Sequence, residues 1–195
     1  MATERLTTLD AVLAEVWRQL TLAVHDKTHA WRTPVLATRD GDAVDARTVV
    51  MREVRSDERQ VLFYTDPRAG KVRQLLCQPQ AVLVLWSPVL AWQLRLQVDL
   101  TLHTQGLDVT SRWARVKMSP SAQDYLSPLP PGAVLVGGDA SRPVNQNKLP
   151  NTHPDSDVFF GVVVAQVHSV DWLELSAQGH RRARFDAQGA RWLQP

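Results

Sequence analysis

The chain has 195 residues, of which 44% are hydrophobic, and this composition predicts a folded domain with a sizeable core rather than a disordered segment. A net charge of +2 is too small to require a nucleic acid as partner, and the single cysteine, Cys77, excludes an internal disulfide or a thiolate cluster for zinc. Residues 1–5 do not resemble a signal peptide and no apolar run reaches the about 20 residues of a membrane helix, so we expect a cytoplasmic protein without membrane contact.

The first predicted elements are a helix and a β-hairpin. Apolar residues recur at three- and four-residue steps after Leu6, which predicts an amphipathic helix over about residues 8–25. The pair Asp40-Gly41 lies between two extended runs, residues 34–38 and 43–51, and such a pair is typical of a tight hairpin turn.

The middle of the chain predicts three more strands and a short helix. Residues 60–65 are rich in aromatic and β-branched types, and a helix over 71–78 would end before Pro79. A wholly apolar run predicts a buried strand over 81–86. The next strand, over 92–100, alternates strictly, so one face should belong to the core and the other to solvent or a ligand.

The last third of the chain begins with a predicted helix over 107–126, interrupted at Pro120, and continues with a loop over about 129–157. Strands over 159–167 and 169–175 and a closing hairpin over 180–193 complete the chain. Strands follow one another without alternating helices, so we expect a single domain over residues 1–195. Its fold class should be mainly β, an antiparallel barrel that is closed or partly closed and carries peripheral helices.

Cations gather around two of these strand ends. Arg47 and Arg52 bracket an apolar run and, five residues apart on an ideal strand, would face opposite sides of it, so one of them needs an anionic partner. Thr65, Arg68 and Lys71 then fall within one strand-to-helix turn, and a helix N-terminus favours a phosphate. A phosphate site and an ordinary solvated turn are both compatible with these residues.

Two other groups of residues are weaker candidates. His25 and His29 are four residues apart and could hold a metal from one helix face, but no carboxylate or cysteine completes the set, so we predict no metal site. The basic run of residues 181–184 alternates within a strand and lacks a wider basic field, so we predict no RNA binding.

The order and spacing of residues over about 46–97 resemble the pyridoxamine 5′-phosphate oxidase family of FMN-binding split barrels, and within it a little-characterised branch of FMN-binding proteins. The residues that carry the resemblance are Arg47 to Arg52, Phe63 to Asp66, Lys71, Gln78-Pro79, Trp86 and Gln93, then Val170 to Leu173, His180 to Phe185, Trp192 and Pro195. The resemblance implies an antiparallel FMN-binding split barrel that forms a homodimer, with FMN at the interface and a small-molecule substrate.

Carried over position by position, the resemblance also implies the cofactor site. Arg47 and Lys71 would neutralise the FMN phosphate, Gln93 would reach the polar edge of the ring, and Trp172 or Leu173 would close the site. The full implied set of FMN-binding residues is Arg47, Thr48, Val49, Val50, Arg52, Tyr64, Thr65, Arg68, Lys71, Gln93, Trp172 and Arg184.

The chain departs from the family pattern where the substrate would bind. Family enzymes place Tyr, Arg and Ser at four-residue steps, and the implied substrate-binding set here is Arg52, Trp113, Lys117, Ser121 and Arg182. An Arg-Leu-His segment of the family corresponds to His180-Arg181-Arg182, and an Arg-Lys pair to Gly70-Lys71, where Arg68 could substitute. The counterpart of a Gln-Ser pair that completes the FMN site is not fixed, with Gln123 and Gln146 as candidates.

FMN binding is therefore better supported than oxidation of a vitamin B6 phosphate. The leading hypothesis is an FMN-dependent oxidoreductase that transfers a hydride to or from a small molecule, with no side chain assigned as acid or base. A flavin-binding module that senses or stores without turnover is the alternative. A barrel that holds another planar ligand, such as haem, is a third hypothesis.

Overall fold

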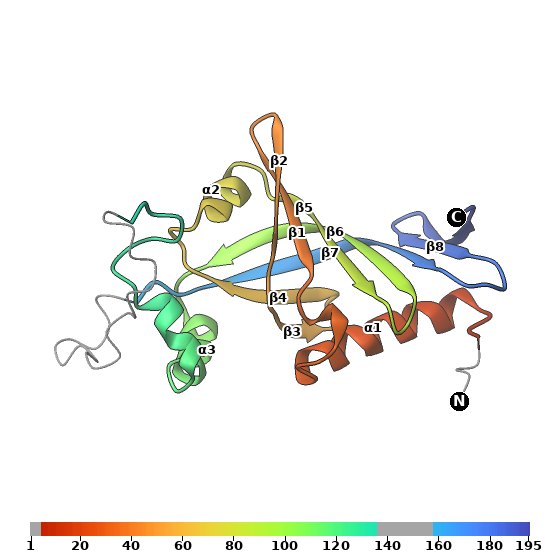
Figure 1. The fold of residues 1–195 in the computed structure, drawn as a ribbon, viewed down its shortest axis with the longest axis horizontal. Coiled ribbons are helices and arrows are strands. Elements are labelled where there is room, and N and C mark those ends of the chain that lie inside the picture. Colours follow the sequence, from red (N-terminus) through yellow and green to blue (C-terminus); the bar gives the residue numbers. More distant parts are fainter. Residues whose placement is uncertain (1–4, 136–157) are drawn as a thin grey trace.

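One antiparallel sheet of nine strands dominates the computed structural model, which describes residues 5–135 and 158–195 (Figure 1). The strands are β1 (Val35–Asp40), β2 (Ala43–Thr48), β3 (Met51–Arg55), β4 (Gln60–Thr65), β5 (Gln80–Ser87), β6 (Trp92–His103), β7 (Gly161–Glu174), β8 (Arg181–Asp186) and β9 (Gly189–Leu193). The helices are α1 (Leu9–His25), α2 (Gly70–Cys77) and α3 (Leu107–Val116), with 3₁₀ turns η1 (Ala30–Arg32) and η2 (Pro120–Tyr125). The predicted mainly β, antiparallel class is confirmed.

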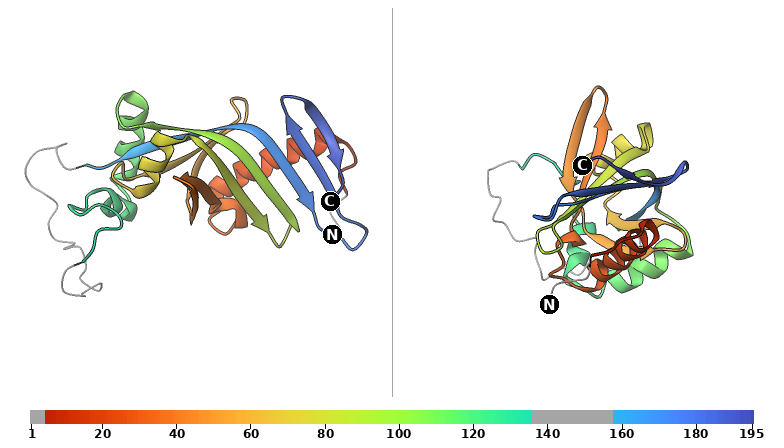
Figure 2. Two further views of the ribbon diagram at one scale, coloured as in Figure 1. Left: turned by 90° about the horizontal axis from the view of Figure 1, so that it is seen from above. Right: turned by 90° about the vertical axis from the view of Figure 1, so that its right-hand side faces the viewer.

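The strand order is β2-β1-β5-β6-β7-β4-β3, and the β8–β9 hairpin extends the sheet from the far half of β7. Among the described residues β2 pairs only with β1 and β3 only with β4, so the sheet curls around its core without closing. Helix α3 and the β8–β9 hairpin lie at opposite ends of the molecule (Figures 1 and 2).

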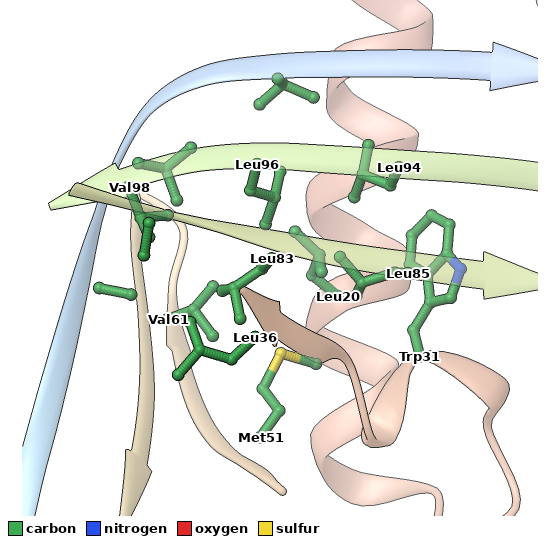
Figure 3. Close-up of a cluster of buried hydrophobic side chains, with 14 of the residues drawn as sticks. Leu20, Trp31, Leu36, Met51, Val61, Leu83, Leu85, Leu94, Leu96 and Val98 are labelled. Atoms are coloured by element: carbon green, nitrogen blue, oxygen red, sulfur yellow. The ribbon is translucent and has the colours of Figure 1, made fainter. Parts of the chain in front are cut away.

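Helix α1 forms where the apolar spacing predicts it. The Oγ1 of Thr8 caps the helix by accepting a hydrogen bond from the backbone nitrogen of Ala11 at 3.2 Å. The stripe of Val12, Val16 and Leu20 is fully buried against the inner face of the sheet. Figure 3 shows Leu20 among the leucines and valines that the strands contribute.

The predicted strand over 43–51 is interrupted, and this difference moves two candidate site residues apart. β2 ends at Thr48 and β3 begins at Met51, while the backbone nitrogen of Val49 donates to the carbonyl of Pro34 at 3.0 Å. Arg47 consequently belongs to the β1–β2 hairpin. Arg52 lies on the opposite edge strand, β3, at a register shift between Met51 and Glu53.

The alternation predicted for residues 92–100 is confirmed and divides the sheet into two faces. Leu94 and Leu96 of β6 are fully buried, whereas the alternating Arg95 and Gln97 are exposed on the opposite face. On that outer face Gln93 is half-buried and pairs in register with Trp86, which is 45% exposed.

None of the helices described here is long and apolar enough to span a membrane.

Candidate functional site

Arg47 reaches the inner side of the β1–β2 hairpin, since it lies opposite the buried Leu36 in register. Its Nη1 donates to the carbonyl oxygen of Leu36 at 3.3 Å and to the hydroxyl of Thr38. Its Nη2 donates to Oε1 of Gln74, on α2, at 2.7 Å and forms an ion pair with Asp45. The guanidinium is therefore fixed between the hairpin and α2.

Gln74 and Asp45 complete this network. The Nε2 of Gln74 donates to Oδ2 of Asp45 at 2.9 Å, and the hydroxyl of Thr38 donates to Oε1 of Gln74 at 2.7 Å. The hydrogen bond from Gln74, followed by that from Arg47, lowers the pKa of the Asp45 carboxyl, which therefore stays ionised. Thr38 and Gln74 are 2% and 4% exposed, but the Asp45 side chain is 51% exposed.

Lys71 lies beside Arg47 in the first turn of α2. The half-buried amine of Lys71 makes no hydrogen bond or ion pair with any residue of 5–135 or 158–195, and Ala69 supplies no side-chain cap to the helix. Burial and then the neighbouring charge of Arg47 lower the pKa of Lys71, while Asp66 opposes them. Two neighbouring cations at an uncapped helix N-terminus form a site suited to an anion.

The turn between β4 and α2 is held by Arg68. Its Nε and Nη2 donate to both carboxylate oxygens of Asp66, at 3.1 and 2.7 Å, and its Nη2 donates to the carbonyl of Ser127 at 2.8 Å. Its guanidinium carbon lies 3.2 Å from the ring centre of Phe159. Thr65 next to Asp66 is 3% exposed. The donors of Arg68 are thus used to hold this turn, so that of Arg47, Arg68 and Lys71 only Lys71 has no hydrogen-bond partner among the described residues.

A second group of predicted residues lies around α3. Arg52 is 5.8 Å from the ring centre of Tyr64, and Trp113 packs against Phe160 and Tyr125 with ring centres 5.4 and 6.2 Å apart. These rings form a small second core under α3. Burial raises the pKa of both tyrosines. The remaining predicted residues of this end are Lys117, which is exposed, Ser121, which is half-buried, and Gln123, which is exposed.

A third group lies at the other end, where the β8–β9 hairpin meets β7. Arg182 donates to Asp171 at 2.8 Å and Arg184 to Asp186 at 2.9 Å. Trp172 is 0% exposed in this chain, because its ring lies in the core, so the prediction that Trp172 or Leu173 closes the cofactor site stays a prediction. The half-buried Leu173 lies beside Gln93 on the outer face. Of the remaining predicted positions, Thr48 is exposed, Val49 buried and Val50 half-buried, whereas Gln146 lies outside the described residues.

The predicted residues therefore do not converge within one chain. Thr65 of β4 pairs with Gly161 of β7. Arg182 of β8 pairs with Leu173, which lies twelve positions further along β7. Twelve residues of β-strand span about 40 Å. The phosphate candidates and the C-terminal arginines thus lie far apart in a single copy (Figure 2).

Sequence reasoning missed Asp45 and Gln74. The spacing of Asp45 and Arg47, two residues apart on a strand, was a readable signal, since such residues share a face. Gln74 gave no signal, because only packing shows that it is buried. A cavity of about 140 Å³ under α3 was also unforeseen; its lining includes Arg55, Leu62, His103, Val109 and Arg112.

Residues 14–104 match the model of a family described as pyridoxamine 5′-phosphate oxidase, FMN-binding domain. No curated protein matched the sequence. The predicted resemblance to this family is thereby confirmed.

Three solved structures illustrate the shared fold. A pyridoxamine 5′-phosphate oxidase-related, FMN binding protein from Nostoc punctiforme has 23% identity and a TM-score of 0.68, over 98% of this chain and 100% of that chain. PhzG from Burkholderia lata, in complex with tetrahydrophenazine-1-carboxylic acid, has 17% identity and a TM-score of 0.77, over 100% of both chains. A heme binding protein from Mycobacterium smegmatis has 15% identity and a TM-score of 0.51, over 92% of this chain and 59% of that chain. The predicted split-barrel fold is confirmed.

Proposed function

We propose that this chain, whose residues 14–104 match the FMN-binding domain of the pyridoxamine 5′-phosphate oxidase family, is a cytoplasmic flavoprotein that binds FMN. The observation that carries the proposal is the half-buried amine of Lys71, which has no partner among the described residues and lies beside Arg47 at the start of α2. A phosphate monoester carries close to two negative charges at neutral pH. Such a group would relieve the repulsion between the two cations.

We propose that neighbouring segments of the chain hold the rest of the cofactor. The segment from Thr48 to Arg52 crosses between two edges of the sheet, so its backbone would border the ring, and Tyr64 and Thr65 would flank it. When bound, FMN would supply hydride transfer to or from a small substrate. The protein's contribution would be to hold the ring, neutralise the phosphate and exclude water.

We further propose that the site is completed by a second copy of the chain. The outer face of the sheet exposes Val35, Val44 and Trp86, at 38%, 74% and 45% of their surface. A two-fold contact through this face would bury them and bring Gln93 and Arg184 of one copy toward Lys71 of the other. This arrangement would explain why the pairing partners of Thr65 and Arg184, two implied cofactor residues, are ten positions apart on β7, which is about 33 Å in one copy.

The test is the visible spectrum of the purified protein and of the protein titrated with FMN. A flavin spectrum, or quenching of FMN fluorescence with saturation at one FMN per chain, is expected. A protein that is colourless and takes up no FMN contradicts the proposal. A Soret band after addition of haem, without FMN binding, would instead favour the ligand that the Mycobacterium smegmatis protein's description names.

Catalysis is the finer part of the proposal, and flavin binding without turnover is the second candidate. What favours the second candidate is that Trp113 is packed against Phe160 and that Arg182 is tied to Asp171, so two positions implied for substrate have structural contacts. With FMN bound, reduction by NADH or NADPH, or oxidation of pyridoxamine 5′-phosphate, is the discriminating assay. Turnover well above that of free FMN would exclude the binding-only function.

A further inference from the structure

The donors of Arg47 are almost fully used by the protein itself. A guanidinium has five N–H groups. Both on Nη1 are directed at Leu36 and Thr38, and both on Nη2 at Asp45 and Gln74. Among the described residues only Nε has no partner. A phosphate therefore cannot receive a bidentate contact from Arg47 until one of these partners leaves.

Asp45 is the partner that can leave. Thr38 and Gln74 are buried, and the carbonyl of Leu36 belongs to a paired strand, whereas the Asp45 side chain is half exposed at the edge of the sheet. Moving this carboxylate into water disturbs no packed side chain. Its departure would leave two donors aimed at one point, because Arg47 Nη2 and Gln74 Nε2 both donate to Oδ2 of Asp45.

We propose that Oδ2 of Asp45 occupies the position of a phosphate oxygen, so that Asp45 competes with the FMN phosphate for Arg47 and Gln74. This inference rests on the proposed function and adds two elements to it. Gln74 becomes a phosphate-binding residue, and Asp45 becomes the residue that limits cofactor affinity. The phosphate first meets Lys71 and then displaces Asp45, whose carboxylate would otherwise repel it.

The test is to measure the affinity of FMN-stripped protein for FMN and for riboflavin by quenching of flavin fluorescence. Asp45→Ala should bind FMN roughly three- to tenfold more tightly than the wild type, since it removes a competing carboxylate from a partly exposed pair. Riboflavin, which lacks the phosphate, should bind both proteins equally. Asp42→Ala is the matched control: it removes the same charge from the exposed turn of the same hairpin and should leave both affinities unchanged.

A second variant tests the role of Gln74. Introduced into the Asp45→Ala protein, Gln74→Leu should reverse the gain in FMN affinity while riboflavin binding stays the same. The proposal is overturned if Asp45→Ala weakens FMN binding or leaves it unchanged, since Asp45 would then orient Arg47 rather than compete. It is also overturned if FMN and riboflavin change together. If neither the wild type nor any variant binds FMN, the proposed function itself is contradicted, and the competition between Asp45 and the phosphate is contradicted with it.

Discussion

Two cations lie side by side in this protein and differ in their hydrogen bonds. Lys71 has no partner in the described residues, whereas Arg47 gives four N–H groups to neighbouring groups of its own hairpin and of α2. A cation without partners breaks no hydrogen bond or ion pair when it turns toward a ligand. Of these two cations, Lys71 is therefore the one whose charge is available to a phosphate.

Lys71→Ala should weaken FMN binding about ten- to a hundredfold, the loss expected for one charge-assisted contact of about 1.5–3 kcal/mol. Riboflavin binding should not change, because the lost contact is to the phosphate. The measurement is a fluorescence titration of the wild type, Lys71→Ala and Lys27→Ala with FMN and with riboflavin. Lys27→Ala, on the exposed surface after α1, is the control and should change neither affinity. An equal loss of FMN and riboflavin affinity in Lys71→Ala would indicate damage to the barrel and contradict the prediction.

Arg47→Ala should behave differently from Lys71→Ala. Removal of the guanidinium leaves the buried Thr38 and Gln74 short of hydrogen bonds, so the free energy of unfolding should fall by about 1–3 kcal/mol. FMN binding should weaken more than riboflavin binding, because Arg47→Ala removes a phosphate contact in addition to disturbing the hairpin. Urea unfolding of the apoprotein checks the first effect, and an unchanged midpoint would show that the network contributes no stability.

The lowered pKa of Lys71 gives FMN binding a pH dependence. Because the pKa of the free site lies below the usual value of 10.5, the ammonium is lost at a lower pH than for an exposed lysine. Bound phosphate stabilises the charged form, so FMN affinity should fall as pH rises above the pKa of the free site. Below that pKa the amine is protonated in both states and Lys71 adds no pH dependence. Lys71→Arg should retain affinity at alkaline pH, which titrations at several pH values would reveal.

Among the elements, the turn between β4 and α2 depends on one buried ion pair. Asp66 is 5% exposed and receives its hydrogen bonds from Arg68, which also donates to the carbonyls of Ser127 and Pro128. This arrangement connects the turn before α2 to the segment after η2. The position of Lys71 therefore depends on Arg68, although the donors of Arg68 are themselves occupied.

Arg68→Ala should destabilise the protein by about 2–3 kcal/mol, because it leaves the carboxylate of Asp66 buried and unpaired. The double variant Arg68→Ala with Asp66→Asn should recover part of that loss, since the amide carries no charge. Chemical unfolding of the wild type, the two single variants and the double variant gives the coupling free energy. A double variant as unstable as the sum of the two single variants would show that the two side chains do not act as a pair.

For the whole molecule, the separation of the implied cofactor residues is the decisive feature. Gln93 and Arg184 lie on the outer face of β6 and β8, and Lys71 lies in the first turn of α2, so a single copy would offer only part of the proposed flavin site. A second copy placed across the outer face would supply the missing part. The exposed Trp86 lies in register beside Gln93 on that face.

Trp86→Glu should therefore convert a dimer into a monomer and weaken FMN and riboflavin binding alike, because a buried charge would disfavour the contact. Light scattering at micromolar concentration, combined with flavin titration, measures both effects. Leu107→Glu, at an exposed position 90% accessible on α3, is the control that should remain dimeric. A wild-type protein that is already monomeric would contradict the two-copy site.

The sequence by itself determined where helices and strands form and that the strands pair in an antiparallel way. The spacing of apolar residues located α1, and strict alternation located the two faces of β6, because these periods follow from the geometry of a single helix or strand. The turn residue Gly41, with φ of +63°, marked the hairpin. The order of motifs over 46–97 also predicted the resemblance to the family whose model matches residues 14–104.

Only the tertiary structure decided which side chains are available. A period-two pattern cannot show that the chain is interrupted between Arg47 and Arg52, because that break depends on Val49 bonding to Pro34. Nor can it show that Trp172 lies in the core or that Gln74 is buried against the hairpin. These properties depend on contacts between residues distant in sequence, and within residues 5–135 and 158–195 such contacts enclose Arg47 and leave Lys71 without a partner.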